Sequence, residues 1–250
     1  MTARRPYLRP LLVWALTGPY MALAVLAGLA LSPFRGGRWA FWHIAPGWVR
    51  QVASAFGIRR HLEGWERLPE EIRSGRQAAL FLANHASHFD PPLLISTLPC
   101  ASVFVAKREL GHVPVLGTAI RMAGFILVDR QHGRKALKSL QEAARRIRGG
   151  QSVTAFPEGT RTRTGELLPF KKGVFVLAQE AGVPVVPVGI LGGRAILPRD
   201  TWRVAPGDYT VRVGTPLDPE AFPDPEALRE AIRRALLGLL EGQEPLQRHP

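Results

Sequence analysis

The chain passes from a strand into a helix within Ala78-Ala79-Leu80-Phe81-Leu82-Ala83-Asn84-His85-Ala86-Ser87-His88-Phe89-Asp90-Pro91-Pro92. The short apolar run 78–83 is typical of a buried strand. Asp90 followed by two prolines predicts a helix that begins there, with Asp90 as its N-cap and proline in the first turn. His85 is therefore expected in a strand-to-helix turn.

His85 and Asp90 are five residues apart, and this spacing suits a turn better than a helix. On a helix the two side chains would point about 140° apart, whereas in a turn the carboxylate can fold back to the imidazole. A carboxylate on one ring nitrogen fixes the tautomer and leaves the other nitrogen free to accept a proton. The pair is thus a candidate general base. The alternative is that Asp90 only caps the helix and His85 is an ordinary loop histidine.

The composition limits the classes of protein and partner. The 33 Lys and Arg residues against 20 acidic residues give a formal net charge of +13, which favours an anionic partner: nucleic acid, an acidic membrane face or a phosphorylated substrate. No helix-turn-helix, zinc-ligand or RNP pattern accompanies the basic residues, so we expect no nucleic-acid partner. The single cysteine, Cys100, excludes an internal disulfide and a cysteine-based metal cluster.

The N-terminal region carries an uncharged apolar run over residues 11–31. This run is long enough to cross a bilayer, and residues 39–58 contain aromatic side chains of the kind found at membrane interfaces. A full span and a hairpin kinked at Gly18-Pro19 within one leaflet are both compatible with the pattern. A cleaved signal peptide and the buried core helix of a soluble protein are the remaining alternatives.

Past residue 60, short apolar runs alternate with helical patterns. The alternation predicts an α/β fold: a single layered domain with a mostly parallel central sheet, at 61–250, preceded by a membrane-anchoring helical segment at 1–60. Strands are expected at 78–83, 102–106, 125–128, 152–156, 183–190 and 209–213, and helices from Pro91 and at 133–147, 172–181 and 225–240.

A second polar cluster follows the expected strand at 152–156. Residues 157–163 combine Glu158, Gly159, Thr160 and two arginines, and a glycine-containing loop with guanidinium groups suits an anion. Lys107 and Arg130 follow two other strands, so in a parallel sheet they would lie at the same edge as His85. An ordinary surface turn with solvated charges is the alternative for this loop.

Four sequence blocks together resemble the glycerolipid acyltransferases similar to bacterial 1-acyl-sn-glycerol-3-phosphate acyltransferase. The blocks are His85 to Asp90 as a His-x4-Asp motif, Gly124 to Arg130, Phe156 to Arg161 and Val183 to Val188. They occur in the order of that family and cover roughly residues 64–192. The resemblance implies transfer of a fatty acyl group from acyl-CoA or acyl carrier protein to a lysophospholipid, with lysophosphatidic acid as the expected acceptor.

The resemblance also implies roles for the residues. His85, oriented by Asp90, would deprotonate the acceptor hydroxyl, which attacks the thioester directly; backbone amides near Gly159 or after His85 would stabilise the oxyanion. Arg161, Lys107 and Arg130 would hold the acceptor phosphate. Motif support is expected from Asn84 and Ser87, while Glu158, Gly159 and Thr160 shape the loop.

We further expect no metal and no cofactor besides the acyl donor, and a catalytic domain on the cytoplasmic side of the inner (plasma) membrane. A metal ion held by His85, His88 and Asp90 is the minor alternative, because thioester acyl transfer does not require Lewis-acid help. Other acceptors remain open, among them glycerol 3-phosphate, another lysophospholipid and a lyso-ornithine lipid. So does a non-catalytic, basic membrane-binding protein that only retains the fold.

Overall fold

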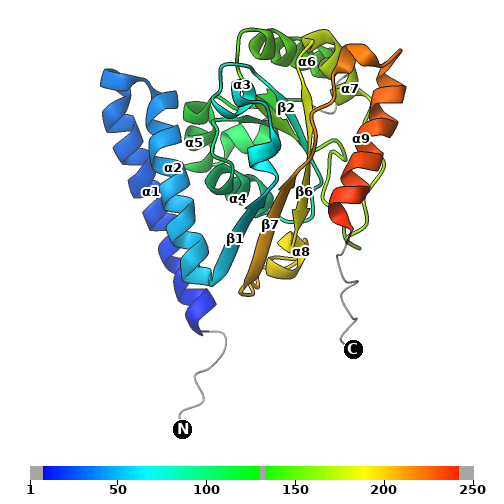
Figure 1. The fold of residues 1–250 in the computed structure, drawn as a ribbon. Coiled ribbons are helices and arrows are strands. Elements are labelled where there is room, and N and C mark those ends of the chain that lie inside the picture. The colour runs from blue at the N-terminus through cyan, green and yellow to red at the C-terminus, as the bar shows by residue number, and fades with distance from the viewer. Residues whose placement is uncertain (1–7, 130–132, 242–250) are drawn as a thin grey trace.

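The computed structural model describes residues 8–129 and 133–241 (Figure 1). The helices are α1 (Leu8–Arg35), α2 (Gly37–Phe56), α3 (Glu70–Arg73), α4 (Asp90–Thr97), α5 (Leu116–Ala123), α6 (Gly133–Arg148), α7 (Gly173–Ala181), α8 (Gly193–Ile196) and α9 (Pro225–Leu240), with 3-10 turns at Trp65–Arg67, Arg108–His112 and Pro219–Ala221. The strands are β1 (Ile58–Glu63), β2 (Leu80–Ala83), β3 (Val103–Lys107), β4 (Ile126–Val128), β5 (Val153–Ala155), β6 (Val185–Leu191) and β7 (Gly207–Val213).

The seven strands form one sheet in the order β1-β7-β6-β2-β5-β3-β4. Strands β6, β2, β5, β3 and β4 run parallel, whereas β7 is antiparallel to β6 and β1 is parallel to β7. The predicted α/β class with a mostly parallel sheet is confirmed. Parallel strands end at one edge, so the loops after β2, β3, β5 and β6 come together there.

The central strand β2 separates two hydrophobic cores because its side chains alternate between the faces of the sheet. Phe81 and Ala83 join the core beneath α2 and α4. Leu80 and Leu82 join the core beneath α6, α7 and α9. All four residues are buried. A strand that is apolar on both faces is typical of a sheet covered by helices on both sides, which is the layering in Figure 1.

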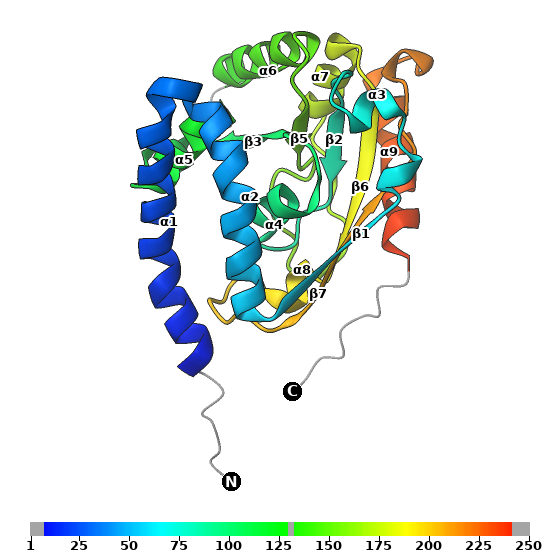
Figure 2. The same cartoon turned by 60° about the vertical axis from the view of Figure 1, so that its left-hand side comes forward.

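The N-terminal region is an antiparallel pair of helices, with α2 lying between α1 and the sheet (Figure 2). Helix α1 continues through Pro19, so the chain does not reverse direction at Gly18-Pro19. The reversal comes instead at Gly36, whose φ of 80° lies in the left-handed region that glycine tolerates. The aromatic segment after it forms α2.

Helix α1 is long and apolar enough to cross a membrane over Leu11–Arg35, with a mean hydropathy of 1.7. Only 6% of that window is buried inside the protein, and the leucines at 11, 12, 16, 23 and 26 are each at least 60% exposed. A core helix would bury these side chains. An exposed apolar face of this kind is compatible with association with a membrane.

Strand β1 was not predicted, because its sequence is mostly charged. Arg59 and His61 both contact Asp208 on the neighbouring β7, and edge strands often carry such charged side chains. Helix α2 ends at Phe56 and β1 begins at Ile58, with Gly57 as the left-handed C-cap between them. Residue 60 thus lies inside β1, and the division into units at 1–60 and 61–250 stays a prediction.

Candidate active site

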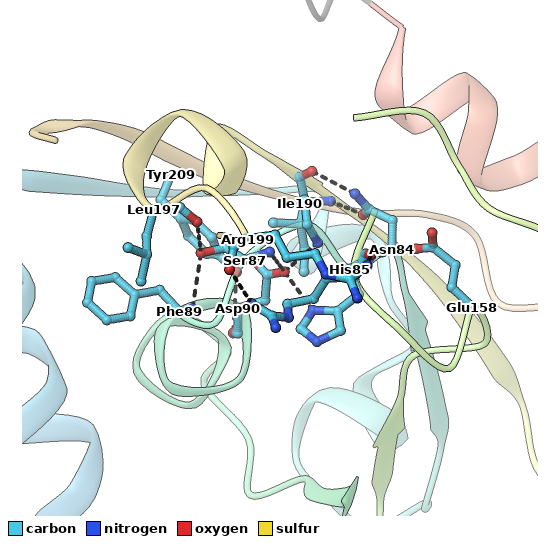
Figure 3. Close-up of polar contacts among 12 residues, drawn as sticks. Asn84, His85, Ser87, Phe89, Asp90, Glu158, Ile190, Leu197, Arg199 and Tyr209 are labelled. Atoms are coloured by element: carbon cyan, nitrogen blue, oxygen red, sulfur yellow. Dashed lines mark hydrogen bonds and ion pairs between the residues drawn. The ribbon is translucent and has the colours of Figure 1, made fainter. Parts of the chain in front are cut away.

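His85 and Asp90 meet in the turn between β2 and α4 (Figure 3). His85 Nδ1 lies 2.8 Å from Asp90 Oδ2. A carboxylate only accepts hydrogen bonds, so this contact assigns the proton to Nδ1 and leaves Nε2 as the basic nitrogen. Asp90 is fully buried and the His85 side chain keeps 16% of its surface exposed. The fixed tautomer and the accessible ring are what a general base requires.

The Asp90 carboxylate also determines the shape of the turn. Its Oδ2 accepts hydrogen bonds from the backbone N–H groups of Ala86, at 2.8 Å, and Ser87, at 2.7 Å. Asp90 is the first residue of α4 and not its N-cap, which is Phe89. The expected capping role is therefore wrong: the carboxylate binds the preceding turn and the histidine, so the alternative of a purely capping Asp90 is also excluded.

The two motif-support residues anchor this turn to the strand β6 and the segment after α8. Asn84 Nδ2 donates to the carbonyl of Ile190 at 3.0 Å, and the backbone N–H of Ile190 donates to Asn84 Oδ1 at 2.6 Å. Ser87 Oγ donates to the carbonyl of Leu197 and accepts from the amide of Phe89. Ser87 is fully buried, so its hydroxyl serves the turn and is not placed as a nucleophile.

Gly193, which the sequence reasoning missed, makes room for Asp90. A Cβ at Gly193 would lie 2.5 Å from Asp90 Oδ1, closer than any non-bonded carbon and oxygen approach in proteins. Oδ1 is buried, and no hydrogen-bond partner for it occurs in the described part of the chain. The Gly192-Gly193 pair at the end of β6 was the available sequence signal, because adjacent glycines at a strand end mark close backbone approach.

The loop after β5 holds the backbone of His85 from both sides. Glu158 Oε1 accepts from the His85 amide at 2.7 Å, and the Thr162 amide donates to the His85 carbonyl at 2.9 Å. The other oxygen of Glu158 accepts from the Leu168 amide at 2.9 Å. Glu158 therefore positions the histidine through its main chain, and Thr162 is a second positioning residue that the sequence did not indicate.

Glu158 has an unusual protonation equilibrium. Burial raises the pKa of its carboxyl from 4.5 to about 7, although the two backbone N–H donors, from Leu168 and His85, act in the opposite direction. Desolvation disfavours the charged form, and here it outweighs the hydrogen bonds. The carboxyl beneath the candidate base thus titrates near neutrality.

The His85 ring opens onto a large apolar cavity. One ring face stacks on Phe156, with centroids 4.0 Å apart and planes inclined by 16°. The cavity has a volume of about 570 Å³, within the usual range for small-molecule sites, roughly 300–1,000 Å³. Its walls come from α1, α2, α4, β3 and α5, and its lining includes Val25, Ala45, Ile95, Phe104 and Ile120. The site is suited to a long hydrocarbon chain.

Basic residues line the same cavity. Arg161 and Lys107 both line it together with His85, and Lys107 Nζ lies 3.2 Å from Glu109 Oε1. Burial is the largest cause that lowers the pKa of Arg161, followed by the nearby charge of Arg199. Two of the three expected basic residues thus line the cavity that His85 lines; Arg130 lies outside the described residues.

The expected oxyanion donors are engaged elsewhere. The amides of Ala86 and Ser87 donate to Asp90, and the Gly159 amide donates to the carbonyl of Phe156 at 3.0 Å. Gly159 and Thr160 line the cavity beside the base. That Gly159 and Thr160 shape the loop stays a prediction. The amides of Ala86, Ser87 and Gly159 would have to leave their present partners before they could bind an oxyanion.

Two further features bear on the chemistry: the Cys100 thiol and the alternative metal site. Burial raises the pKa of the Cys100 thiol to about 12, which leaves it protonated and unreactive. Within residues 8–129 and 133–241, no group of three or more His, Cys, Asp or Glu side chains is arranged to hold a metal ion.

A family model described as Acyltransferase matches residues 59–191, more than half of the chain. The chain belongs to the acyltransferase family. The matched region contains β1 to β6, the His85 turn and the 158–163 loop, so the features described above are those that the family model covers.

Curated relatives within the acyltransferase family point to one substrate class. A 1-acyl-sn-glycerol-3-phosphate acyltransferase of Limnanthes douglasii is 35% identical over 177 residues, which cover 70% of this chain and 59% of the plant protein. The 1-acyl-sn-glycerol-3-phosphate acyltransferase alpha of Homo sapiens is 33% identical over 185 residues, covering 73% and 64%. The aligned part spans roughly three-fifths of the length of these relatives.

A solved structure resembles almost the whole chain. The 1-acyl-sn-glycerophosphate (LPA) acyltransferase PlsC from Thermotoga maritima is 27% identical, with a TM-score of 0.80 and coverage of 93% of each chain. The similarity therefore includes the helix pair as well as the sheet domain.

Proposed function

We propose that this protein transfers a fatty acyl group to the free hydroxyl of 1-acyl-sn-glycerol 3-phosphate, making phosphatidic acid for phospholipid biosynthesis. The observation that carries the proposal is that His85, oriented by Asp90, lines an apolar cavity of about 570 Å³ together with the basic residues Lys107 and Arg161. An acyl chain and a phosphate are the two chemical groups that an apolar lining with basic side chains accommodates. The relatives named above carry the same activity in their names.

In the proposed reaction His85 acts as the general base. Nε2 removes the proton of the acceptor hydroxyl while Asp90 stabilises the imidazolium that forms. The hydroxyl oxygen attacks the thioester carbonyl, and the thiolate leaves after collapse of the tetrahedral intermediate. The imidazolium can return its proton to that thiolate, so the histidine is regenerated and no acyl-enzyme is required.

The acyl donor in this proposal is acyl-CoA or acyl carrier protein. The cavity wall reaches from His85 to Met21 and Val25 on α1, so a chain bound there would extend from the reacting carbonyl toward the helix pair. The donor is a substrate, and the proposed mechanism uses no metal and no other cofactor.

The acceptor phosphate would be held at the rim of the cavity. Arg161 offers a planar guanidinium that can bind two phosphate oxygens, and Lys107 supplies a compact charge. Arg130 is assigned to the same task from the sequence alone.

The protein would act at a membrane surface. The exposed leucines of α1 would enter the lipid, and we assign the catalytic domain to the cytoplasmic side of the inner membrane. The lipid acceptor would then come from the membrane and the acyl donor from the aqueous phase on the same side.

An acceptor series tests this function. Purified protein in detergent is given radiolabelled palmitoyl-CoA or palmitoyl acyl carrier protein with lysophosphatidic acid, glycerol 3-phosphate, other lysophospholipids or lyso-ornithine lipid. We expect phosphatidic acid as the main product. Transfer to one of the other acceptors alone would move the assignment to that acceptor, and no transfer by folded protein would favour a non-catalytic membrane-binding protein.

A further inference from the structure

The loop between α8 and β7, residues 197–206, lies against the loop that carries Arg161. Arg199 Nη1 donates to the Arg161 carbonyl at 2.7 Å, and Arg161 Nη1 donates to the Arg199 carbonyl at 3.3 Å. Each arginine thus holds the main chain of the other. This reciprocal pair fixes two half-buried guanidinium groups side by side, and Figure 3 draws Arg199 among the polar residues around His85.

No ion pair neutralises these two guanidinium groups in the described part of the chain, although the nearby charges of Asp200 and Asp90 partly offset the charge of Arg161. Among the described residues neither Arg161 nor Arg199 forms an ion pair with a carboxylate, whereas the neighbouring Arg163 pairs with Asp200, Nε to Oδ2, at 3.3 Å. Burial is the largest cause that lowers the pKa of Arg161 and of His88, and the positive charge of Arg199 adds to the lowering in both cases. Two like charges held together and close to the catalytic turn are stabilised when an anion binds between them.

The same loop is tied to the membrane-associating helix. Trp14 Nε1 on α1 donates to the carbonyl of Trp202 at 2.9 Å, and the two indole rings meet edge to face with centroids 5.9 Å apart. Trp202 in turn lies parallel to His88, with ring centroids 6.4 Å apart. The loop that carries Arg199 is therefore held between the active-site turn and α1.

We propose that Arg199 is a second phosphate-binding arginine that, together with Arg161, clamps the headgroup phosphate of the acceptor. This inference rests on the proposed function, because it assigns the phosphate of the same acceptor. Arg199 lies in the segment after β6, beyond the four sequence blocks, so the motif pattern gave no indication of it.

The first test compares Arg199→Ala with wild type on two acceptors. With lysophosphatidic acid we expect the KM to rise about ten-fold or more, since a charge-assisted hydrogen bond to phosphate is lost, while kcat changes little. With monoacylglycerol, which lacks the phosphate, the two proteins should have the same KM. Arg199→Lys should restore part of the affinity because it keeps the charge without the planar fork.

The matched control is Arg203→Ala, which removes an exposed arginine from the same loop. It should leave the KM for both acceptors unchanged. If Arg203→Ala raises the KM for lysophosphatidic acid as much as Arg199→Ala does, the increase comes from the loss of any positive charge in this loop. The assignment of Arg199 as a phosphate ligand is then wrong.

A double-mutant cycle separates a direct contact from an effect through Arg161. Binding of lysophosphatidic acid is measured by calorimetry in detergent for wild type, both single alanine variants and the double variant. A direct contact predicts that Arg199→Ala still weakens binding several-fold in the Arg161→Ala background. No further weakening there would show that Arg199 only positions Arg161, and would overturn the proposal.

These outcomes also distinguish failure of the inference from failure of the function. If wild type makes phosphatidic acid and Arg199→Ala has an unchanged KM, the inference fails and the function stands. If folded wild type neither binds nor acylates lysophosphatidic acid, the proposed function fails first.

Discussion

At the scale of single residues, the site depends on a few backbone hydrogen bonds around His85. The Glu158 carboxylate accepts a hydrogen bond from the His85 amide, and the Thr162 amide donates one to the His85 carbonyl. These bonds fix the main chain of the histidine, while Asp90 fixes its ring. A carboxylate that accepts two backbone donors is not replaceable by an amide, because the NH2 group of glutamine would face one of those N–H groups.

The raised pKa of Glu158 makes stability depend on pH. The carboxyl titrates near 4.5 in the unfolded chain and at about 7 in the folded protein, so its protonated form contributes stability below pH 4.5 that is lost as the pH rises to 7. The loss is on the order of 3 kcal/mol. Denaturant unfolding in detergent should show wild type losing stability relative to Glu158→Gln across this window; a constant difference between the two proteins would contradict it.

Gly193 gives a second residue-scale prediction. Gly193→Ala puts a Cβ where Asp90 Oδ1 lies, so the carboxylate must move and the His85 ring loses its orientation. We expect kcat to fall about 10²-fold or more, with little change in the KM for either substrate. Gly238→Ala is the control, because a Cβ there has nothing within 4 Å. Equal kcat values for the two variants would show that Gly193 has no such role.

At the scale of elements, the helix pair forms part of the cavity and holds the α8–β7 loop. Trp14 packs against Phe56 of α2 and Phe89 at the start of α4, and its indole N–H reaches Trp202. One side chain of α1 thus contacts the other helix, the active-site turn and the loop that carries Arg199.

Trp14→Phe removes the hydrogen bond to Trp202 but keeps an aromatic ring against its neighbours. We expect a several-fold increase in the KM for lysophosphatidic acid, because the α8–β7 loop loses an anchor, and little change in the KM for the acyl donor. Trp39→Phe, which alters a ring stacked on His43 near the start of α2, serves as the comparison. If both variants have the same KM for lysophosphatidic acid, the contact between Trp14 and this loop does not affect acceptor binding.

The wall formed by α2 gives a prediction on chain length. Ala45 lines the cavity, so Ala45→Phe should fill part of it and shorten the acyl chains that fit. The measurement is the ratio of transfer rates with lauroyl-CoA and palmitoyl-CoA, which we expect to rise about ten-fold relative to wild type. An unchanged ratio would indicate that the acyl chain does not occupy this part of the cavity.

At the scale of the whole molecule, the sequence predicts the elements that are strongly apolar. The strands β2 to β7 and the helices α4, α6, α7 and α9 lie within a few residues of their expected positions, because buried parallel strands and amphipathic helices have clear patterns. The polar edge strand β1 and the single-turn helix α8 have no such pattern. The apolar run 11–31 predicts helix but not its antiparallel partner.

The candidate site was predictable where one motif contains both partners. His85 and Asp90 are five residues apart, so the sequence alone indicates their contact. Gly193, Thr162 and Arg199 come from other segments, and only folding brings them to the turn. Contacts between distant segments depend on sheet order, which a single sequence does not specify.

The central claim is that His85 is the base that allows lysophosphatidic acid to be acylated, and one measurement tests it most directly. Transfer of radiolabelled palmitate to lysophosphatidic acid is followed for purified wild type beside His85→Ala, with both proteins checked for folding by circular dichroism. We predict phosphatidic acid from wild type and a loss of about 10²- to 10⁴-fold in kcat for the variant. Transfer by His85→Ala at the wild-type rate would contradict the account.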